Sequence, residues 1–209
     1  MARYIGPVCK LCRREGGKLY LKGQRCFSEK CSVTRRPYPP GQHGQARQKI
    51  SEYGLRLREK QKMRRIYGLL EHQFRLYYTE ASRLTGRTGE EMIGLLERRL
   101  DNLVHRAGFT LTRAQARQLV RHNHILVNGK RVNIPSYRVN VGDKVEIREK
   151  SRKIAYLTSS LQTAATREGA SWLDVDGANF AVTFKSLPPR DELNEPSMRE
   201  QLVVEYYSR

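Results

Sequence analysis

Apolar side chains follow helical spacing through the middle of the chain. They recur on one face at Leu70, Phe74, Tyr77, Tyr78 and Ala81, and again at Met92, Leu95, Leu96, Leu100, Leu103 and Val104. Residues three and four positions apart lie on the same side of a helix, so both stripes predict helices with one buried face. We expect helices over residues 51–97, beginning near Ser51. The second stripe fits either one helix or two helices with a break near Arg98.

The pattern changes after residue 110. Thr112 and Gln115 have the spacing of a capping box, which predicts the start of a short helix. Asn128-Gly129 lies between two apolar runs and predicts a β-hairpin with a two-residue turn, because both residues tolerate positive φ. Further expected elements are a strand ending at residue 147, a helix over residues 154–161, strands on both sides of residues 176–177 and a short helix from about residue 196.

The charge of the chain is high and unevenly placed. The formal net charge is +19 over 209 residues. The first 150 residues carry 33 Lys and Arg against 13 Asp and Glu, whereas the last 59 carry 7 against 8. Self-repulsion on this scale destabilises a compact state unless a polyanion relieves it, so a nucleic acid is the expected partner. No apolar run approaches the length of a membrane span and no signal peptide opens the chain, which predicts a cytosolic protein without a membrane partner.

The cysteines are confined to one short window. They are Cys9, Cys12, Cys26 and Cys31, with the spacing Cys-x2-Cys, thirteen residues, then Cys-x4-Cys. Two close pairs joined by a loop let four thiolates converge on one tetrahedral metal ion, and zinc is the default. Four protein ligands leave no open coordination position, so the predicted ion is structural. An iron–sulfur cluster uses the same ligands. The alternatives without metal are two disulfides, which fit poorly with a cytosolic chain, or four buried thiols.

Basic residues gather on two predicted helices and on the hairpin. Within residues 56–65 cationic side chains recur every four positions, and Glu59 is the only acidic residue. A second stripe consists of Arg113, Arg117 and Arg121. Like charges at this spacing destabilise an isolated helix, so we expect both stripes to face RNA, where the planar arginine fork suits phosphate. The residues predicted to bind RNA are Arg3, Arg13, Arg14, Lys22, Arg35, Arg36, Arg47, Lys49, Arg56, Arg58, Lys60, Lys62, Arg64, Arg65, Arg113, Arg117, Arg121, Lys130 and Arg131.

One short motif invites an enzymatic interpretation. Arg99-Leu100-Asp101 is similar to the Arg-Leu-Asp around the catalytic aspartate of pseudouridine synthases, but the Thr-Ser-Gly stretch that normally follows is absent. Asp101 is therefore expected on the surface of an ordinary amphipathic helix, paired with a nearby arginine. The sequence contains no glycine-rich phosphate loop and no nucleophile–base motif, so the chain is predicted not to be an enzyme.

Residues 98–147 resemble the compact RNA-binding module named after the ribosomal S-four proteins. The whole chain is similar to the bacterial-type S-four family of small-subunit ribosomal proteins, from MARYIGP at residues 1–7 through PGQHG at 40–44 and LREKQK at 57–62 to VVEYYS at 203–208. Many relatives lack these cysteines, so the metal is not expected to be essential to the family's function.

The resemblance implies a primary RNA-binding protein that nucleates assembly of the small subunit. It would bind a multi-helix junction in the 5′ domain of small-subunit ribosomal RNA, in the cytoplasm. It would contact ribosomal protein S-five and contribute to translational accuracy. Residues matching Arg47 and Lys49 would line the channel through which messenger RNA enters.

The expected fold class is α+β, with three parts. Residues 1–50 form a basic arm that binds metal through four cysteines. Residues 51–97 form a mainly helical domain, to which residues 188–209 return. Residues 98–187 form an inserted α/β RNA-binding domain with short helices and a small antiparallel sheet, its core module spanning 98–147. Two other functions stay open at this point: an RNA-modifying enzyme similar to pseudouridine synthases, and a zinc-dependent regulator that binds nucleic acid.

Overall fold

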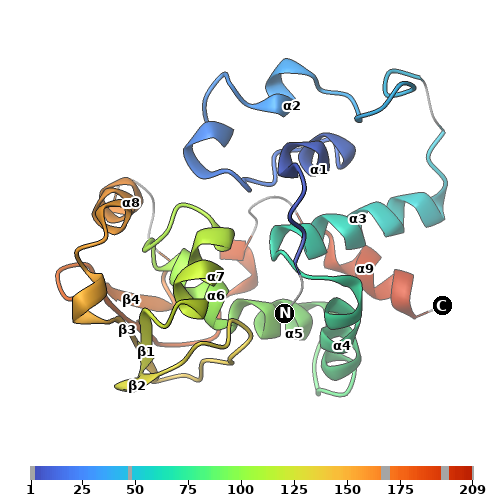
Figure 1. The fold of residues 1–209 in the computed structure, drawn as a ribbon. Helices are drawn as coiled ribbons and strands as arrows, with labels where there is room; N and C mark the ends of the chain where they lie inside the picture. Colours follow the sequence, from blue (N-terminus) through green and yellow to red (C-terminus); the bar gives the residue numbers. More distant parts are fainter. Residues whose placement is uncertain (1–2, 47–48, 166–169, 194–197, 209) are drawn as a thin grey trace. The chain divides into compact units, whose positions relative to one another are not determined.

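The chain forms two compact units in the computed structural model, which describes residues 3–46, 49–165, 170–193 and 198–208. One unit comprises Met1–Ile93 and Asn194–Arg209, and the other comprises Gly94–Leu193. In the described residues no helix is both long and apolar enough to cross a membrane. Figure 1 gives the element labels.

The N-terminal part of the first unit contains only short helices. These are α1 (Val8–Arg14), the 3-10 helix η1 (Gly23–Cys26) and α2 (Ser32–Arg35), with α1 packed against α2. The Ser32 hydroxyl donates a hydrogen bond to the carbonyl of Cys9 at 3.5 Å. Beyond α2 the chain bends through a turn, in which the amide of Gly44 donates to the carbonyl of Gly41. Few apolar side chains are buried here, so this segment relies on polar contacts.

The helical part of the first unit is built on α3 (Glu52–Ile66), α4 (Glu71–Ala81) and α9 (Glu200–Tyr207), with the start of α5 (Thr88–Glu97). Ser51 caps α3, as predicted, by accepting a hydrogen bond from the amide of Gly54 at 3.1 Å. The C-terminal helix α9 lies along α3, although well over a hundred residues separate them (Figure 1). The core buries Met63, Ile66, Phe74, Tyr77 and Val203.

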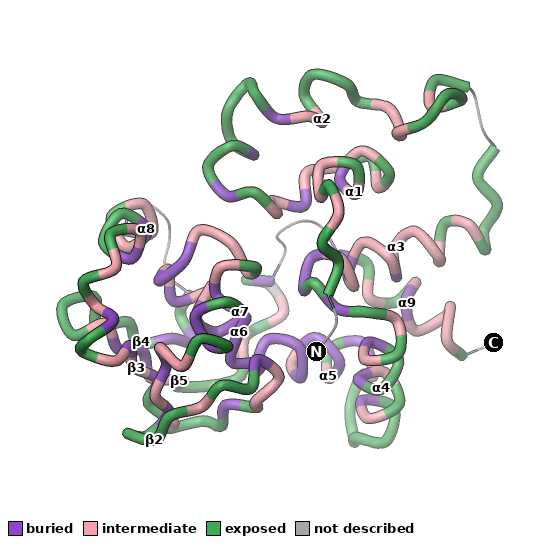
Figure 2. The backbone as a smooth tube through the Cα atoms, in the orientation of Figure 1, coloured by how far each residue is buried: buried purple, intermediate pink, exposed green. Residues whose placement is uncertain are grey.

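The second unit resolves the open question about Arg98. α5 ends at Glu97 and α6 (Leu100–Arg106) begins three residues later, so the apolar stripe forms two helices. Arg99 is extended at the break and forms an isolated antiparallel bridge with Arg138. The first five residues of α6 are buried, including Asp101 and Asn102 (Figure 2). α6 packs against α7 (Arg113–Arg121), which the Thr112 side chain caps by accepting a hydrogen bond from the amide of Gln115 at 3.2 Å. The cap at Thr112 is thus confirmed.

A five-stranded antiparallel sheet completes the second unit. Its strands are β1 (Ile125–Val127), β2 (Lys130–Arg131), β3 (Lys144–Ile147), β4 (Leu173–Asp176) and β5 (Ala181–Phe184), in the order β2-β1-β3-β5-β4. Beside it lie η2 (Glu149–Ser151), α8 (Ala155–Ala165) and η3 (Arg190–Leu193).

The predicted hairpin turn is present between β1 and β2. Val127 pairs with Lys130, and the two residues between them, Asn128 and Gly129, have φ values of 49° and 75°. Mixed helices with a small antiparallel sheet confirm the α+β class.

Candidate nucleic-acid interface

The cationic side chains of α3 are paired within the first unit. Arg56 donates to Glu205 of α9 at 2.7 Å, and Arg58 and Arg65 both form ion pairs with Glu15, whose side chain is 1% exposed. Glu59 is the only acidic residue within residues 56–65, but it is not the only acidic partner of this helix. Acidic residues from other elements reach this helix and relieve the repulsion among its like charges.

Lys60 is buried rather than exposed. Its ammonium group donates to Glu71 of α4 at 2.7 Å and lies 4.6 Å from the centre of the Tyr206 ring. The hydroxyl of Tyr207 also donates to Glu71, at 2.7 Å. Burial favours the neutral form of Glu71, but these two hydrogen bonds outweigh it and lower the pKa of the carboxyl group. Burial and the neighbouring Glu71 in turn raise the pKa of Tyr207.

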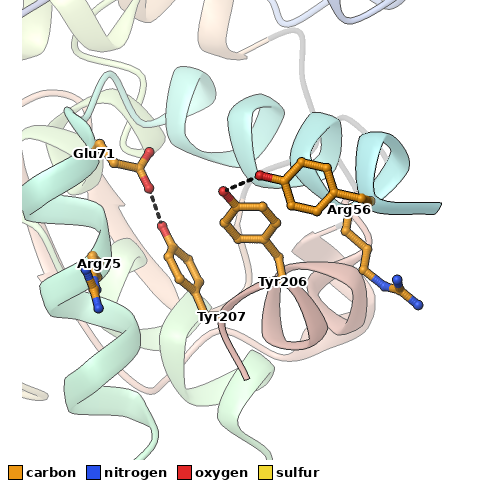
Figure 3. A pocket seen from close by; sticks show the side chains of 6 residues that line it. Arg56, Glu71, Arg75, Tyr206 and Tyr207 are labelled. Atoms are coloured by element: carbon orange, nitrogen blue, oxygen red, sulfur yellow. Dashed lines mark hydrogen bonds between the residues drawn. The ribbon is translucent and has the colours of Figure 1, made fainter. Parts of the chain in front are cut away.

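Glu71, Tyr206 and Tyr207 line a pocket of about 390 Å³ in the first unit, together with Tyr53. Figure 3 shows the Tyr207 hydroxyl pointing at Glu71 and the Tyr206 hydroxyl pointing at that of Tyr53, 3.5 Å away. Arg56 and Arg75 complete the lining. The residues that line the pocket come from α3, α4 and α9, so the pocket lies where these three helices pack together.

The arginines of α1 are engaged with the proline-rich segment. Arg13 donates to the carbonyl of Tyr38 at 2.9 Å and stacks over the Tyr38 ring, and Arg14 donates to the carbonyl of Pro40 at 3.2 Å. Lys49 is exposed, while Arg47 lies outside the described residues. Four more of the predicted RNA-binding residues are exposed here, namely Arg3, Lys22, Arg35 and Arg36.

The four cysteines lie in this same segment, all as free thiols. Over the described ranges, no three His, Cys, Asp or Glu side chains come together in a group that could hold a metal ion. Burial raises the pKa of the Cys12 thiol; a backbone hydrogen bond at Leu19 lowers it, and repulsion from the other three cysteines raises it further. The amide of Lys22 donates to the sulfur of Cys26 at 3.4 Å. Burial raises the pKa of Cys31, but the amides of Val33 and Thr34 outweigh it and lower the pKa below its ordinary value.

In the second unit, α6 fixes two of the three arginines of α7. Arg113 donates to the side-chain oxygen of Asn102 at 2.8 Å, and Arg117 donates to Asp101 at 3.0 Å. No acidic side chain within the described part of the chain pairs with Arg121, which is exposed. The stripe predicted from the spacing therefore contains two anchored arginines followed by one that extends into solvent.

A buried polar network supports this arrangement. Glu97, 1% exposed at its side chain, accepts two hydrogen bonds from Arg106 and one from the side-chain amide of Asn102. Because a carboxylate only accepts, it orients the Asn102 amide with its oxygen toward Arg113. His105 is enclosed beside Arg113 and Arg106, and burial followed by these charges lowers its pKa to about 3. His105 is therefore neutral. The two arginines, Arg106 and Arg113, outnumber the one carboxylate, Glu97, so the network has a net positive charge.

Asp101 lies in a different place from the one expected. It pairs with arginine, as predicted, but it is buried rather than exposed on the helix surface. Its two oxygens accept from Arg99 at 3.0 and 2.8 Å, and the second also accepts from Arg117. A carboxylate held by two guanidinium groups is poorly suited to nucleophilic attack, because both charges stabilise its resting form.

The hairpin presents Lys130 and Arg131 on an exposed edge strand (Figure 2). Asn128 ties the turn to β3, since its side chain donates to Asp143 at 2.8 Å and accepts from the amide of Lys144 at 2.9 Å. The two cations are thus held at a fixed position along the sheet edge. Like charges on such an edge also discourage pairing with another strand.

The sequence interpretation missed the residues that hold these cations. They are Glu15, Glu71 and Glu205 in the first unit and Glu97 and Asn102 in the second. Only Glu97 and Asn102 had a local signal, because they lie beside the Arg99-Leu100-Asp101 motif. Glu71 lies on the next helix, eleven positions from Lys60, whereas Glu15 and Glu205 pair with residues 43 or more positions away in the sequence.

Comparisons with known proteins agree with this architecture. The family model described as "Ribosomal protein S4/S9 N-terminal domain" matches residues 3–97, and the "S4 domain" model matches residues 98–145. "Small ribosomal subunit protein uS4" of Geotalea daltonii and that of Geobacter sulfurreducens are each 56% identical over 209 residues, and that of Thermus thermophilus is 57% identical over 210. Each match covers 100% of both chains. The chain therefore belongs to the uS4 family of small ribosomal subunit proteins.

Proposed function

We propose that the chain is a structural component of the small ribosomal subunit that binds folded small-subunit ribosomal RNA in the cytoplasm. Its membership of the uS4 family carries this conclusion. The family is structural, and the chain is not an enzyme. The interpretations as an RNA-modifying enzyme or a zinc-dependent regulator are not favoured by its relatives.

The contacts would be made mainly with phosphates and sugars. The exposed cations are spread over both units, on the N-terminal segment and on α7 and the β1–β2 hairpin. Contacts to the RNA backbone fix position and orientation without reading base identity. Folded RNA is recognised largely by its shape, so specificity would come from a fold that offers phosphates to both units at once. The α3 cations, largely paired with acidic residues, would contribute mainly by shaping this unit.

The finer assignment is a multi-helix junction in the 5′ domain of that RNA. Binding there early would nucleate assembly of the subunit. Ribosomal protein S-five would be a neighbour, and residues Arg47 and Lys49 would line the channel through which messenger RNA enters. These assignments rest on the family resemblance, and the abundance of exposed cations is compatible with them.

We also propose that Cys9, Cys12, Cys26 and Cys31 bind one structural zinc ion. The donor set is four cysteine sulfurs in two closely spaced pairs, which suits zinc, and backbone amides already donate to the sulfurs of Cys26 and Cys31. Such hydrogen bonds commonly surround metal-bound thiolates. Bound zinc would stabilise a segment that has little apolar core of its own. Measuring bound zinc and iron in protein purified without added metal distinguishes zinc from an iron–sulfur cluster.

The test of the ribosomal role is sedimentation of a cell lysate that contains the tagged chain. The chain is expected to migrate with small ribosomal subunits through a sucrose gradient. It should move to the top of the gradient after ribonuclease digestion. Migration as free protein in an untreated lysate would contradict the proposal.

A further inference from the structure

The Arg99-Leu100-Asp101 motif remains unexplained once an enzymatic role is set aside. Asp101 is buried at the start of α6, and its carboxylate touches two guanidinium groups. Arg99, 1% exposed, holds both carboxylate oxygens, whereas Arg117, 12% exposed, touches one of them with a single nitrogen. The two arginines therefore relate to the aspartate differently.

The charge balance of this cluster is the important point. One carboxylate and two guanidinium groups leave a net charge of +1. Arg99 already compensates Asp101 through two hydrogen bonds, so the contact with Arg117 orients its side chain without cancelling its charge. Arg99 is enclosed, whereas Arg117 is partly exposed. The positive charge that Asp101 does not compensate is therefore accessible from solvent at Arg117.

Building on the RNA-binding function proposed above, we infer that Asp101 is a positioning residue for RNA. It holds Arg117 in a fixed orientation on α7, ready to donate to a phosphate. A fixed arginine loses less conformational entropy on binding than a freely rotating one. Its planar fork then presents donors in a defined direction, which a lysine ammonium cannot do.

The same helix provides a matched comparison. Arg121 lies one turn beyond Arg117 on the same stripe and has no ion-pair partner among the described residues. It carries the same charge but is not anchored. Arg121 is therefore expected to act as a mobile charge, replaceable by lysine, whereas Arg117 is expected to depend on its geometry.

A double-mutant cycle on the full chain tests this inference. The probe is a transcript of the 5′ domain of Geobacter sulfurreducens small-subunit ribosomal RNA, and circular dichroism verifies that each variant is folded at the temperature used. Asp101→Asn is expected to weaken binding about tenfold in the native background and in Arg121→Gln, as expected for loss of one charge-assisted contact. In the Arg117→Gln background it should weaken binding less than about twofold.

An equal loss in all three backgrounds would overturn the inference, because Asp101 would then act independently of Arg117. If Asp101→Asn does not fold, lysine replacements at Arg117 and Arg121 test the inference instead. Arg117→Lys should lose as much affinity as Arg117→Gln, while Arg121→Lys should bind like the native chain. Equal behaviour of the two lysine variants would contradict the inference. If neither glutamine variant binds more weakly, α7 does not contact this RNA, and the proposed interface fails along with the inference.

Discussion

Tyr207 and Glu71 join the last helix of the chain to α4, 136 residues earlier, through a 2.7 Å hydrogen bond. The acceptor, the Glu71 carboxylate, also accepts a hydrogen bond from the buried ammonium group of Lys60. The C-terminal segment is thus part of the first unit's packing.

Replacing Tyr207 with Phe should destabilise the first unit. The change removes a hydrogen bond to a charged group, which typically contributes about 1.5–3 kcal/mol. Urea unfolding should show a loss in that range. Tyr206→Phe is the matched control, since the one hydrogen-bond partner of its hydroxyl among the described residues is the Tyr53 hydroxyl, at the long distance of 3.5 Å. Equal losses for the two variants would refute the role assigned to Glu71.

The enclosed His105 should make stability depend on pH. Its pKa is about 3 in the folded chain, against about 6.5 in an unfolded one. The unfolded state therefore binds the proton first as the pH falls, and the contribution of this residue, complete above about pH 6.5, is lost progressively toward pH 3. Between pH 6.5 and 5 the free energy of unfolding should fall by at most about 1.4 kcal/mol per pH unit.

His105→Gln should remove the share of this dependence that His105 contributes, because glutamine does not titrate, while the smaller share of His124, whose pKa burial also lowers, remains. His122 is exposed and serves as the control, so His122→Gln should keep the native slope. The measurement is denaturant unfolding of the three chains at pH 6.5, 6.0 and 5.0. The interpretation fails if the native chain and His105→Gln share one slope.

The turn between β1 and β2 should tolerate side chains poorly at Gly129. Its φ of +75° is disfavoured for residues with a Cβ, at a cost of roughly 1–2 kcal/mol. Gly129→Ala should therefore destabilise the second unit by about that amount, although nothing lies within 4 Å to clash with the new methyl group. Gly177→Ala is the control, because Gly177 has no positive φ and similar open space. Thermal unfolding distinguishes the two, and an identical melting temperature would contradict the account.

Removing metal should loosen the N-terminal segment. A chelator is expected to make residues 10–36 more sensitive to trypsin, since this segment buries few apolar side chains. Serine at both Cys26 and Cys31 should give the same sensitivity without chelator. Cleavage rates that are indifferent to both treatments would argue against a metal.

Local chemistry explains which features could be read from the sequence. The cap at Thr112 and the turn at Asn128-Gly129 each depend on neighbouring residues, and the structure confirms both. The break after Glu97 coincides instead with the bridge between Arg99 and Arg138. These residues are 39 positions apart, and the spacing of apolar residues along a helix cannot predict such a contact.

The basic stripes illustrate the same limit. Spacing placed the cations of α3 on a shared face, but it did not reveal that Glu15 and Glu205 pair with them. It also could not separate anchored Arg117 from unanchored Arg121. A charge pattern therefore predicted the class of partner better than the role of each residue.

The most direct test of the central claim is the affinity of the full chain for the 5′-domain transcript, compared with a 3′-domain transcript of the same length and with duplex DNA. At moderate salt the 5′ domain should bind at least about 100-fold more tightly. Its affinity should fall steeply with salt, by a slope of roughly 0.7 to 0.9 for each phosphate neutralised. Equal affinity for all three nucleic acids would contradict recognition of a folded ribosomal RNA.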